Sequence, residues 1–279
     1  MTTSAADRVT SFERVGLTFD VTDGGPRGGP VVVLLHGFPA DRTGWHRVEP
    51  LLHAAGLRTL APDQRGYSPG AAPTEVAAYH LEELVADVIA LADAAGVDRF
   101  HVVGHDWGGA IAWLLAGNHA DRVASVTVLS TPHPGALSRA LRTADQRRRS
   151  WYMAAFQVPT LPERLFASRF HLVMARMGLP LDEMARYAAR LARPEALTGP
   201  INWYRAAGSS SMRAHRVTVP ATYVWGSDDP ALGRTAAELT GEHVTGDYAF
   251  IELDANHWLP ETRPEECAAA IVDRVRSAG

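Results

Sequence analysis

The motif that most limits how this chain can fold is Gly104–Gly109, which reads GHDWGG and lies between an apolar segment and a helical one. Phe100–Val103 before it is typical of a buried strand, and Ala110–Ala116 after it favours a helix. Glycines at both ends allow a strand and a helix to approach closely through a tight turn. Such a turn would expose Asp106 at the end of the strand. The alternative is that Asp106 only caps the helix, a position that suits aspartate.

Strands and helices alternate on both sides of this motif. The expected strands are Val31–Leu35, Arg58–Ala61, Phe100–Val103, Val123–Leu129, Ala221–Trp225 and Tyr248–Leu253. The clearest expected helices are Leu81–Ala95, whose apolar residues recur at helical spacing, and an amphipathic segment at Pro264–Arg276. This alternation is typical of an α/β fold with a mostly parallel sheet and helices on both faces.

The alternation is interrupted between Pro134 and His215. This stretch is helical and rich in arginine, and it contains no clear strand. A helical block between two parts of one sheet indicates an insertion. We therefore predict a core domain formed by residues 1–133 and 216–279, with residues 134–215 inserted as a helical lid, or cap.

The composition excludes several classes of function. The chain carries a formal net charge of −4, so no global basic field exists, and neither a nucleic acid nor a membrane is expected as a partner. The run Arg147–Arg149 is expected to be a solvated helix face. All 27 basic residues are arginine, which excludes a lysine Schiff base.

The lone cysteine, Cys267, rules out an internal disulfide and a cysteine-rich zinc site. No segment has the pattern of a secretory signal, and no apolar run is long enough to span a bilayer. These features favour a cytoplasmic protein. The arginine- and alanine-rich composition is typical of a bacterial one.

Three more motifs come directly after expected strands: His36–Pro39, the pair Asp228 and Asp229, and a segment that contains His257. Taken singly, the first two are typical of turns, and a lone histidine is usually structural. The carboxyl ends of parallel strands meet at one edge of a sheet, where ligands bind, so we expect these residues to converge with Asp106. Nucleophile, acid and histidine in this chain order form the catalytic triad of hydrolases with a nucleophile elbow.

An aspartate at the elbow favours a particular reaction. A carboxylate suits displacement at an sp³ carbon and forms an alkyl ester, whereas serine attacks acyl carbons. The backbone amides of Phe38 and Trp107 would then stabilise the oxyanion that forms when the ester is hydrolysed. There is no His-Glu-x-x-His motif, and the glycine spacing of Gly104–Gly109 does not fit a dinucleotide site. Neither a metal nor an organic cofactor is therefore expected.

Together with Asp63–Ser68, these motifs make the chain similar to α/β-hydrolases of the epoxide hydrolase and haloalkane dehalogenase branch. The resemblance covers nearly the whole chain apart from its N-terminal residues and the middle of the predicted lid. It implies that Asp106 is the nucleophile, that His257 activates water, and that Asp229 orients His257. Asp228 is the alternative acid, and Asp229 is preferred because the acid of this family also stands directly before a proline.

The predicted lid contains two motifs that resemble those of epoxide hydrolases. Tyr152 stands four residues before a Phe-Gln pair, and Tyr204 lies in the run Asn-Trp-Tyr-Arg. The resemblance implies that both hydroxyls bond the epoxide oxygen, which develops negative charge as the ring opens. Both could instead be core tyrosines, as we expect for Tyr187, which lies in no such motif. The side chains expected to line the substrate pocket are His36, Pro39, Trp203 and Trp258.

We therefore predict an epoxide hydrolase that converts a small apolar epoxide and water into a vicinal diol through an ester on Asp106. The alternative with the same nucleophile is a haloalkane dehalogenase, in which Trp107 and either Trp151 or Trp203 would hold the halide. An alternative of another class is a non-catalytic protein that binds a small ligand. The sequence leaves the oligomeric state open, with a homodimer as one option.

Overall fold

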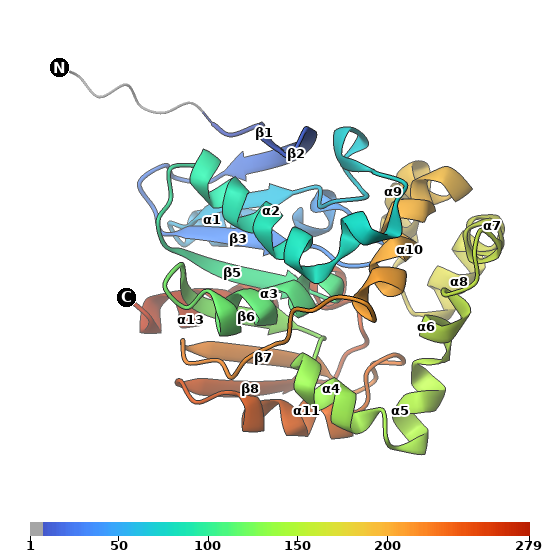
Figure 1. Cartoon of the computed structure of the whole chain (residues 1–279). Coiled ribbons are helices and arrows are strands. Elements are labelled where there is room, and N and C mark those ends of the chain that lie inside the picture. Colours follow the sequence, from blue (N-terminus) through green and yellow to red (C-terminus); the bar gives the residue numbers. More distant parts are fainter. Residues whose placement is uncertain (1–7) are drawn as a thin grey trace.

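One eight-stranded sheet organises the protein, which a computed structural model describes over residues 8–279 (Figure 1). The strands are β1 (Ser11–Arg14), β2 (Leu17–Gly24), β3 (Val31–Leu35), β4 (Arg58–Pro62), β5 (Phe100–His105), β6 (Val123–Leu129), β7 (Ala221–Gly226) and β8 (Tyr248–Leu253). Their order across the sheet is β1-β2-β4-β3-β5-β6-β7-β8. β2 runs antiparallel to β1 and β4, and the strands from β4 onward run parallel. The first seven residues of the predicted core domain lie outside the described range.

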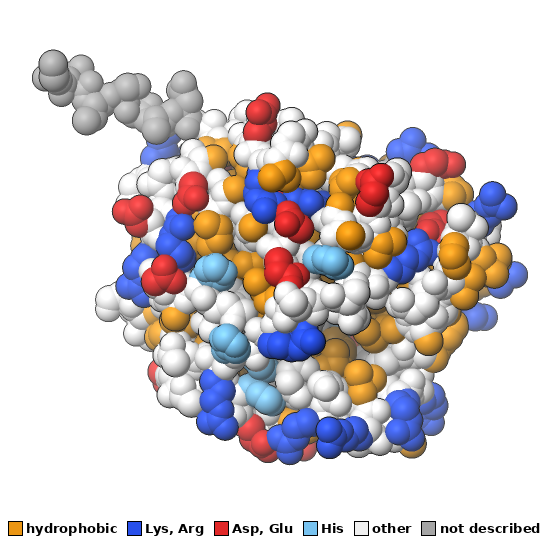
Figure 2. Space-filling view, viewed as in Figure 1, with side chains coloured by type: hydrophobic (Ala, Val, Ile, Leu, Met, Phe, Trp, Pro, Cys, Tyr) orange, Lys and Arg blue, Asp and Glu red, His pale blue; other side chains and the backbone are white. Residues whose placement is uncertain are grey.

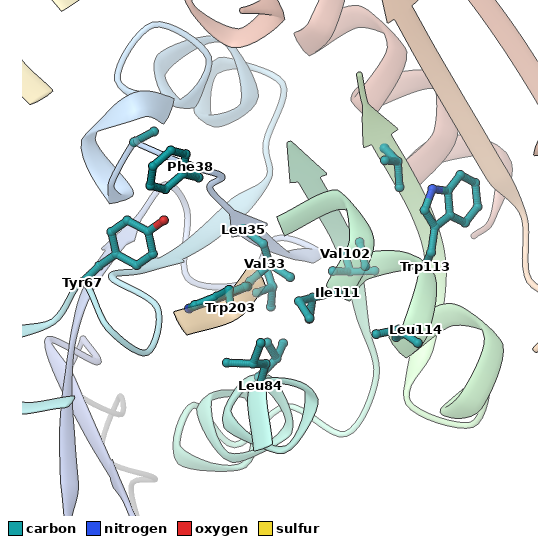
Figure 3. Packing of buried hydrophobic residues seen from close by; sticks show 14 of the residues in the cluster. Val33, Leu35, Phe38, Tyr67, Leu84, Val102, Ile111, Trp113, Leu114 and Trp203 are labelled. Carbon is teal, nitrogen blue, oxygen red and sulfur yellow. The ribbon is translucent and has the colours of Figure 1, made fainter. Parts of the chain in front are cut away.

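The central strands are buried on both faces, which explains their uninterrupted apolar sequences. On β3, Val33 and Leu35 belong to one hydrophobic cluster, whereas Val32 and Leu34 belong to a second cluster on the opposite face. Successive side chains of a strand point to opposite faces, so one apolar run supplies both layers. Figure 3 shows Val33 and Leu35 of the first cluster beside Ile111.

Helices cover both faces of the sheet. The α-helices are α1 (Glu49–Ala54), α2 (Leu81–Ala94), α3 (Trp107–Asn118), α4 (Pro134–Ala140), α5 (Ala144–Arg149), α6 (Trp151–Ala155), α7 (Leu161–Ser168), α8 (Phe170–Arg176), α9 (Leu181–Leu191), α10 (Pro194–Ala207), α11 (Arg234–Leu239), α12 (Leu259–Thr262) and α13 (Pro264–Ser277). Short 3₁₀ helices are η1 (Arg42–Trp45), η2 (Pro69–Ala71), η3 (Val76–Tyr79) and η4 (Thr240–His243). Leu84 of α2 and Ile111 of α3 join the first cluster, whereas Leu52 of α1 and Ile271 of α13 join the second.

The helices α4 to α10 lie between β6 and β7 in the sequence and form an inserted helical region beyond the ends of the parallel strands (Figure 1). Direct contacts tie helices of this region to the core, as α10 and α9 illustrate. Trp203 of α10 donates its indole N–H to the carbonyl of Arg65 at 2.8 Å. Arg190 of α9 forms ion pairs with the buried carboxylates of Asp63 at 2.8 Å and Asp41 at 3.0 Å.

The predicted fold class is confirmed, and the six expected strands correspond to β3 through β8. The antiparallel pair β1 and β2 was not predicted. β1 has only four residues, and in both strands few residues are fully buried, as on an edge that packs on only one face. In residues 8–279, we find no helix with the length and apolar character that a membrane span requires.

Candidate active site

Asp106 occupies a strained turn between β5 and α3. Its backbone has φ 51° and ψ −121°, and its side chain makes no hydrogen bond to cap α3. Glycines make this turn sterically feasible: a Cβ on Gly104 would lie 2.1 Å from the carbonyl oxygen of Gly108, and one on Gly108 would lie 2.1 Å from that of Leu35. The alternative of a simple helix cap is therefore wrong, and the strain is of the kind that proteins keep at functional sites.

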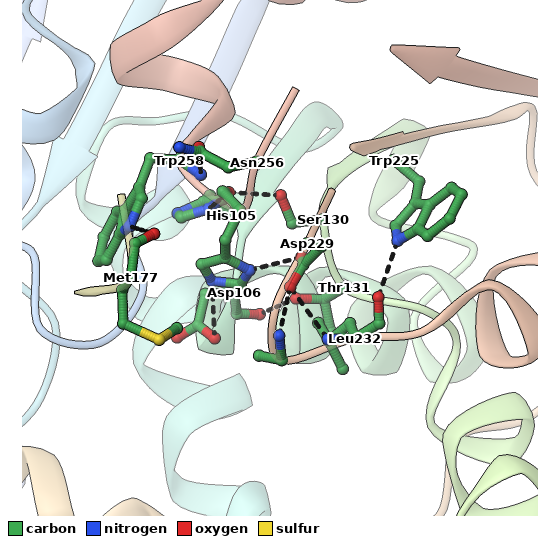
Figure 4. Close-up of polar contacts among 12 residues, drawn as sticks. His105, Asp106, Ser130, Thr131, Met177, Trp225, Asp229, Leu232, Asn256 and Trp258 are labelled. Atoms are coloured by element: carbon green, nitrogen blue, oxygen red, sulfur yellow. Dashed lines mark hydrogen bonds and ion pairs between the residues drawn. The ribbon is translucent and has the colours of Figure 1, made fainter. Parts of the chain in front are cut away.

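The turn brings Asp106 together with the other two residues of the predicted triad, His257 and Asp229. Figure 4 shows Asp106 and Asp229 on this side of the sheet. His257 lies between two carboxylates, with its Nδ1 at 2.7 Å from Asp229 Oδ2 and its Nε2 at 3.5 Å from Asp106 Oδ2. The second oxygen of Asp229 accepts hydrogen bonds from the amides of Ala231 and Leu232 at 2.7 and 2.9 Å. The neighbouring Asp228 is exposed, so the contact with His257 is made by Asp229.

Three polar residues that were not predicted hold this arrangement in place. The backbone carbonyl of His257 contacts Ser130 Oγ at 2.7 Å and His105 Nε2 at 2.8 Å. Thr131 Oγ1 donates to the carbonyl of Asp106 at 2.7 Å. Ser130 and Thr131 directly follow β6, so the rule that functional residues gather at the strand ends could have found them.

The charges of the site depend on one another. Burial disfavours the charged form of Asp106, but the hydrogen bond and charge of His257, together with the amide of Phe38, hold the pKa of Asp106 below its usual value. Burial would also lower the pKa of His257, but the charges of Asp229 and Asp106 and their hydrogen bonds raise it to about 10. These contacts favour the imidazolium form of His257 in the resting site. Burial lowers the pKa of His105 to about 4, so His105 is neutral and donates through Nε2.

A cavity of about 800 Å³ extends from Asp106 and His257 into the inserted helical region. Its wall is mostly apolar, with Phe38 and Trp258 from the core and Phe156 from the loop after α6. The amide of Phe38 donates to Asp106 Oδ1 at 2.7 Å, at the position predicted for an oxyanion donor. In the described residues, no group of three or more His, Cys, Asp or Glu side chains is arranged to hold a metal ion.

Tyr152 of α6 and Tyr204 of α10 both line this cavity. Their rings lie 5.9 Å apart between centroids, and the ring of Tyr204 lies 4.9 Å from that of Trp107. Burial and the charge of Asp106 raise the pKa of both phenols well above its usual value. The structure therefore brings two protonated hydroxyl groups from the inserted region to the cavity of the predicted nucleophile.

The four residues expected to line the pocket fall into two pairs. Pro39 and Trp258 lie on the cavity wall. His36 and Trp203 are buried behind it: His36 Nε2 accepts from the amide of Gln64 at 3.2 Å, and the indole N–H of Trp203 faces the carbonyl of Arg65. Tyr187 has the structural role expected of it, because its hydroxyl donates to Glu261 Oε1 at 2.7 Å.

Comparison with known proteins places this geometry in a family. The sequence matches the family model described as alpha/beta hydrolase fold over residues 30–264. It is 32% identical to Epoxide hydrolase A of Mycobacterium tuberculosis, over 92% of this chain and 94% of that protein. It is 34% identical to AB hydrolase superfamily protein YfhM of Bacillus subtilis, over 89% of this chain and 91% of that protein.

A solved structure agrees with these sequence matches. The crystal structure of Epoxide Hydrolase A from Mycobacterium thermoresistibile superposes with a TM-score of 0.83 at 30% identity, covering 95% of this chain and 97% of that chain. Both the core and the inserted helical region therefore fall within the shared fold. The chain belongs to the α/β hydrolase superfamily, in which the relatives that match it over most of their length include epoxide hydrolases.

Proposed function

We propose that this protein is an epoxide hydrolase that opens a small apolar epoxide to a vicinal diol. One observation carries the proposal: a charged aspartate and two protonated phenols, Tyr152 and Tyr204, lie on the wall of one apolar cavity. A carboxylate nucleophile needs an electrophilic carbon, and the phenols suit a leaving oxygen that stays attached to the substrate. The epoxide hydrolases among the relatives support the same reaction.

In the first step, an oxygen of Asp106 attacks one ring carbon and forms an ester bond, while the bond between that carbon and the ring oxygen breaks. The electron pair of the broken bond stays on the ring oxygen, which becomes an alkoxide. Tyr152 and Tyr204 donate hydrogen bonds to this oxygen, and one of them transfers its proton. The raised pKa of both phenols keeps them protonated until the alkoxide forms.

Ester formation also prepares the second step. The esterified Asp106 has lost its charge, so one of the two carboxylates that raise the pKa of His257 no longer does so. His257 can then release its proton, which replaces the one that the phenol gave up. The neutral imidazole, still oriented by Asp229 at 2.7 Å, is available as a general base when a base is needed.

In the second step, His257 removes a proton from water, and the water oxygen attacks the carbonyl carbon of the ester. The amide of Phe38, already bonded to Asp106 Oδ1, stabilises the oxyanion, and the amide of Trp107 is the second donor that we propose. The ester bond breaks, and the second proton of the water goes to the departing alcohol. The products are the diol, the Asp106 carboxylate and protonated His257, so the site returns to its resting charge.

The inserted helices have a defined place in this proposal. We infer that residues 134–215 act as a lid domain on the core, because both phenols come from them while the triad comes from the strand ends. A lid that contributes donors can couple substrate entry to the completion of the site. Asp106, His257 and both phenols share one cavity, which makes a purely ligand-binding role less well supported.

One observation favours haloalkane dehalogenase activity as a second candidate. The indole N–H of Trp107 is buried and, in the described residues, has no hydrogen-bond partner, so it could bind a halide ion. The two candidates for the second halide donor are poorly placed. Trp203 already donates to a backbone carbonyl, and Trp151 is 68% exposed. The epoxide reaction is therefore better supported.

Intact-protein mass spectrometry of the His257→Ala variant tests the proposal, because this variant should form the ester but not hydrolyse it. A panel of epoxides should give an adduct equal to the whole epoxide mass. The adduct should be absent when Asp106 is also changed to alanine. An adduct from terminal haloalkanes alone, equal to the haloalkane minus hydrogen halide, would assign the protein as a dehalogenase. No adduct from either panel, on folded protein, would contradict covalent catalysis on these substrates.

A further inference from the structure

The outer part of the inserted region exposes an unusual number of apolar side chains. Of the ten large hydrophobic residues that are exposed in residues 8–279, five lie within residues 151–172. We call these five side chains the mouth face: Trp151, Val158, Leu161, Leu165 and Leu172. All except Leu172 also line the outer end of the active-site cavity. Scattered exposed hydrophobic residues need no explanation, but a cluster around the opening of a cavity does.

The same segment is strongly basic. Residues 134–176 contain eight arginines and two acidic residues, a formal charge of +6, although the whole chain carries −4. The two acids do not offset the outer arginines, because Glu163 is buried against Arg205 and Asp145 pairs with Arg148 and Arg149. The expectation that no membrane binds rested on the net charge of the chain, which conceals this uneven distribution.

Three arginines lie next to the mouth face without a counterion in residues 8–279. Arg164 on α7, Arg176 on α8 and Arg169 between these helices are exposed, and none has an acidic partner in the described residues. Figure 2 shows blue arginine side chains around hydrophobic ones on the right-hand edge, where α7 and α8 lie in Figure 1. Proteins bind anionic lipid surfaces through two features, exposed apolar side chains and unpaired cations, and both are present here.

We propose that the mouth face docks on an anionic lipid bilayer, so that the cavity opens toward the membrane. In this orientation the apolar side chains enter the interfacial region, and the arginines contact lipid phosphates while their stems lie along the apolar surface. The remaining residues carry a formal charge of −10, which is −4 minus +6, so anionic lipid would repel the rest of the molecule and favour this orientation. An apolar epoxide dissolved in the bilayer could then enter the cavity without crossing water.

A second copy of the chain fits this surface less well. Two mouth faces brought together by twofold symmetry would place like charges opposite each other, and the two acidic residues of the segment, Asp145 and Glu163, already pair with other arginines. An anionic bilayer supplies the missing negative charge. Charge complementarity therefore favours an anionic lipid bilayer over a second copy of the chain as the partner of the mouth face.

Sedimentation of the full-length protein with vesicles tests the proposal. We would compare vesicles of phosphatidylglycerol and phosphatidylcholine in equal amounts with vesicles of phosphatidylcholine alone, at low and at high salt. The test variant combines Arg164→Gln, Arg176→Gln and Leu172→Gln, since these residues do not line the cavity. The matched control combines Arg216→Gln, Arg276→Gln and Leu51→Gln, which change the same residue types elsewhere on the surface.

We expect the wild-type protein to bind the anionic vesicles at low salt, to bind the neutral vesicles at least tenfold more weakly, and to be released by high salt. Each lost arginine should weaken binding by roughly fivefold, so the test variant should bind at least tenfold more weakly than the wild type while the control binds as the wild type does. Both variants should hydrolyse a water-soluble epoxide at the wild-type rate. The measurement of epoxide hydrolysis rests on the proposed function, whereas the measurement of vesicle binding does not.

Two results would overturn the docking proposal. The first is the absence of binding of wild-type protein to anionic vesicles at low salt. The second is equal binding by the test variant and the wild type. A dimer detected by sedimentation velocity, lost in the test variant and accompanied by no vesicle binding, would show that a second copy covers the mouth face and would reject the membrane.

Discussion

The core side and the inserted side of the cavity hold their reactive groups in different ways. On the core side, Asp106, Asp229 and His257 each follow a strand, and hydrogen bonds involving the backbone fix each of them. On the inserted side, Tyr152 and Tyr204 lie in helices and are surrounded by aromatic rings. The charged groups therefore have positions set by the sheet, whereas the phenols have positions set by side-chain packing. The two sides should respond differently to substitution.

The strongest test of the core side is Asp229→Asn. The oxygen of the new amide would be retained by the N–H groups of Ala231 and Leu232, so its NH₂ group would face His257. This forces His257 Nδ1 to become an acceptor and places the proton on Nε2, where the base is required. We expect hydrolysis of the ester to slow by about 10³- to 10⁴-fold. An Asp-to-Asn change in a Ser-His-Asp triad has an effect of this size, because the histidine then adopts the wrong tautomer. Rapid-quench measurement of ester formation and decay would separate the two steps.

The exposed neighbour provides a matched control. Asp228→Asn should leave both steps at the wild-type rate, since Asp228 makes no contact with His257. If the two variants behaved alike, the assignment of Asp229 as the orienting acid would be wrong.

The difference between the two sides also explains what could be predicted from the sequence. Residues that follow apolar strands were predictable, because strand ends converge at one edge whatever the surrounding loops do. The unpaired arginines and the packing partners of the phenols were not, because helices of the insertion have no common edge that brings distant residues together. Trp203 illustrates the limit: its motif was found, but its rotation toward Arg65 rather than the cavity depends on how α10 packs.

The N-terminal strands show a second limit. β1 and β2 are only partly buried, so their sequences lack the apolar runs that made β3 and β6 obvious. Ser130 and His105 were missed for another reason. They act on the backbone of His257 rather than through the reacting atoms, so no side-chain motif marks this contact, although the position of Ser130 after β6 was a signal that could have been used.

On the inserted side, Tyr204→Phe is the most informative change. Phenylalanine preserves the ring contacts with Trp107 and Phe156 but removes the hydroxyl. We expect ester formation to slow by about a hundredfold, which is the usual cost of losing one donor to a developing oxyanion. Hydrolysis of the ester should be unchanged because the core performs it. Tyr152→Phe should have the same signature, and a wild-type rate of ester formation in both variants would remove the phenols from the mechanism.

The contact between the two sides offers a test of stability. Glu261 of the core accepts a hydrogen bond from Tyr187 of α9, and burial, reinforced by the charge of Glu183, raises the pKa of Glu261 to about 7 from 4.5. A raised carboxyl pKa means that ionisation is penalised in the folded state, so the penalty appears as pH rises from 4.5 to 7 and is complete above 7. Glu261→Gln keeps an acceptor for Tyr187 without the charge.

We therefore expect Glu261→Gln to raise the free energy of unfolding by about 1 to 3 kcal/mol at pH 8, and by less as the pH falls toward 4.5. Urea denaturation at several pH values would measure this dependence. A gain that does not vary with pH, or a loss at pH 8, would show that the ionised carboxylate is tolerated between the core and the inserted region.

The smallest expected effect comes from a substitution at Phe156, which tests whether side-chain packing alone positions the two phenols. Phe156 lies against the rings of both Tyr152 and Tyr204, at centroid distances of 5.8 and 4.9 Å, and its ring contact with the core is to Phe38 at 5.5 Å. Phe156→Leu retains most of the buried volume but loses these edge-on ring contacts, which are each worth about 1 kcal/mol. If packing alone positions the phenols, ester formation should slow by roughly threefold to tenfold, while the rate of ester hydrolysis stays the same. Single-turnover kinetics with one epoxide would resolve both rates. Equal slowing of the two steps would mean that the inserted side and the core side are not independent, and that packing around the phenols also positions the water that His257 activates.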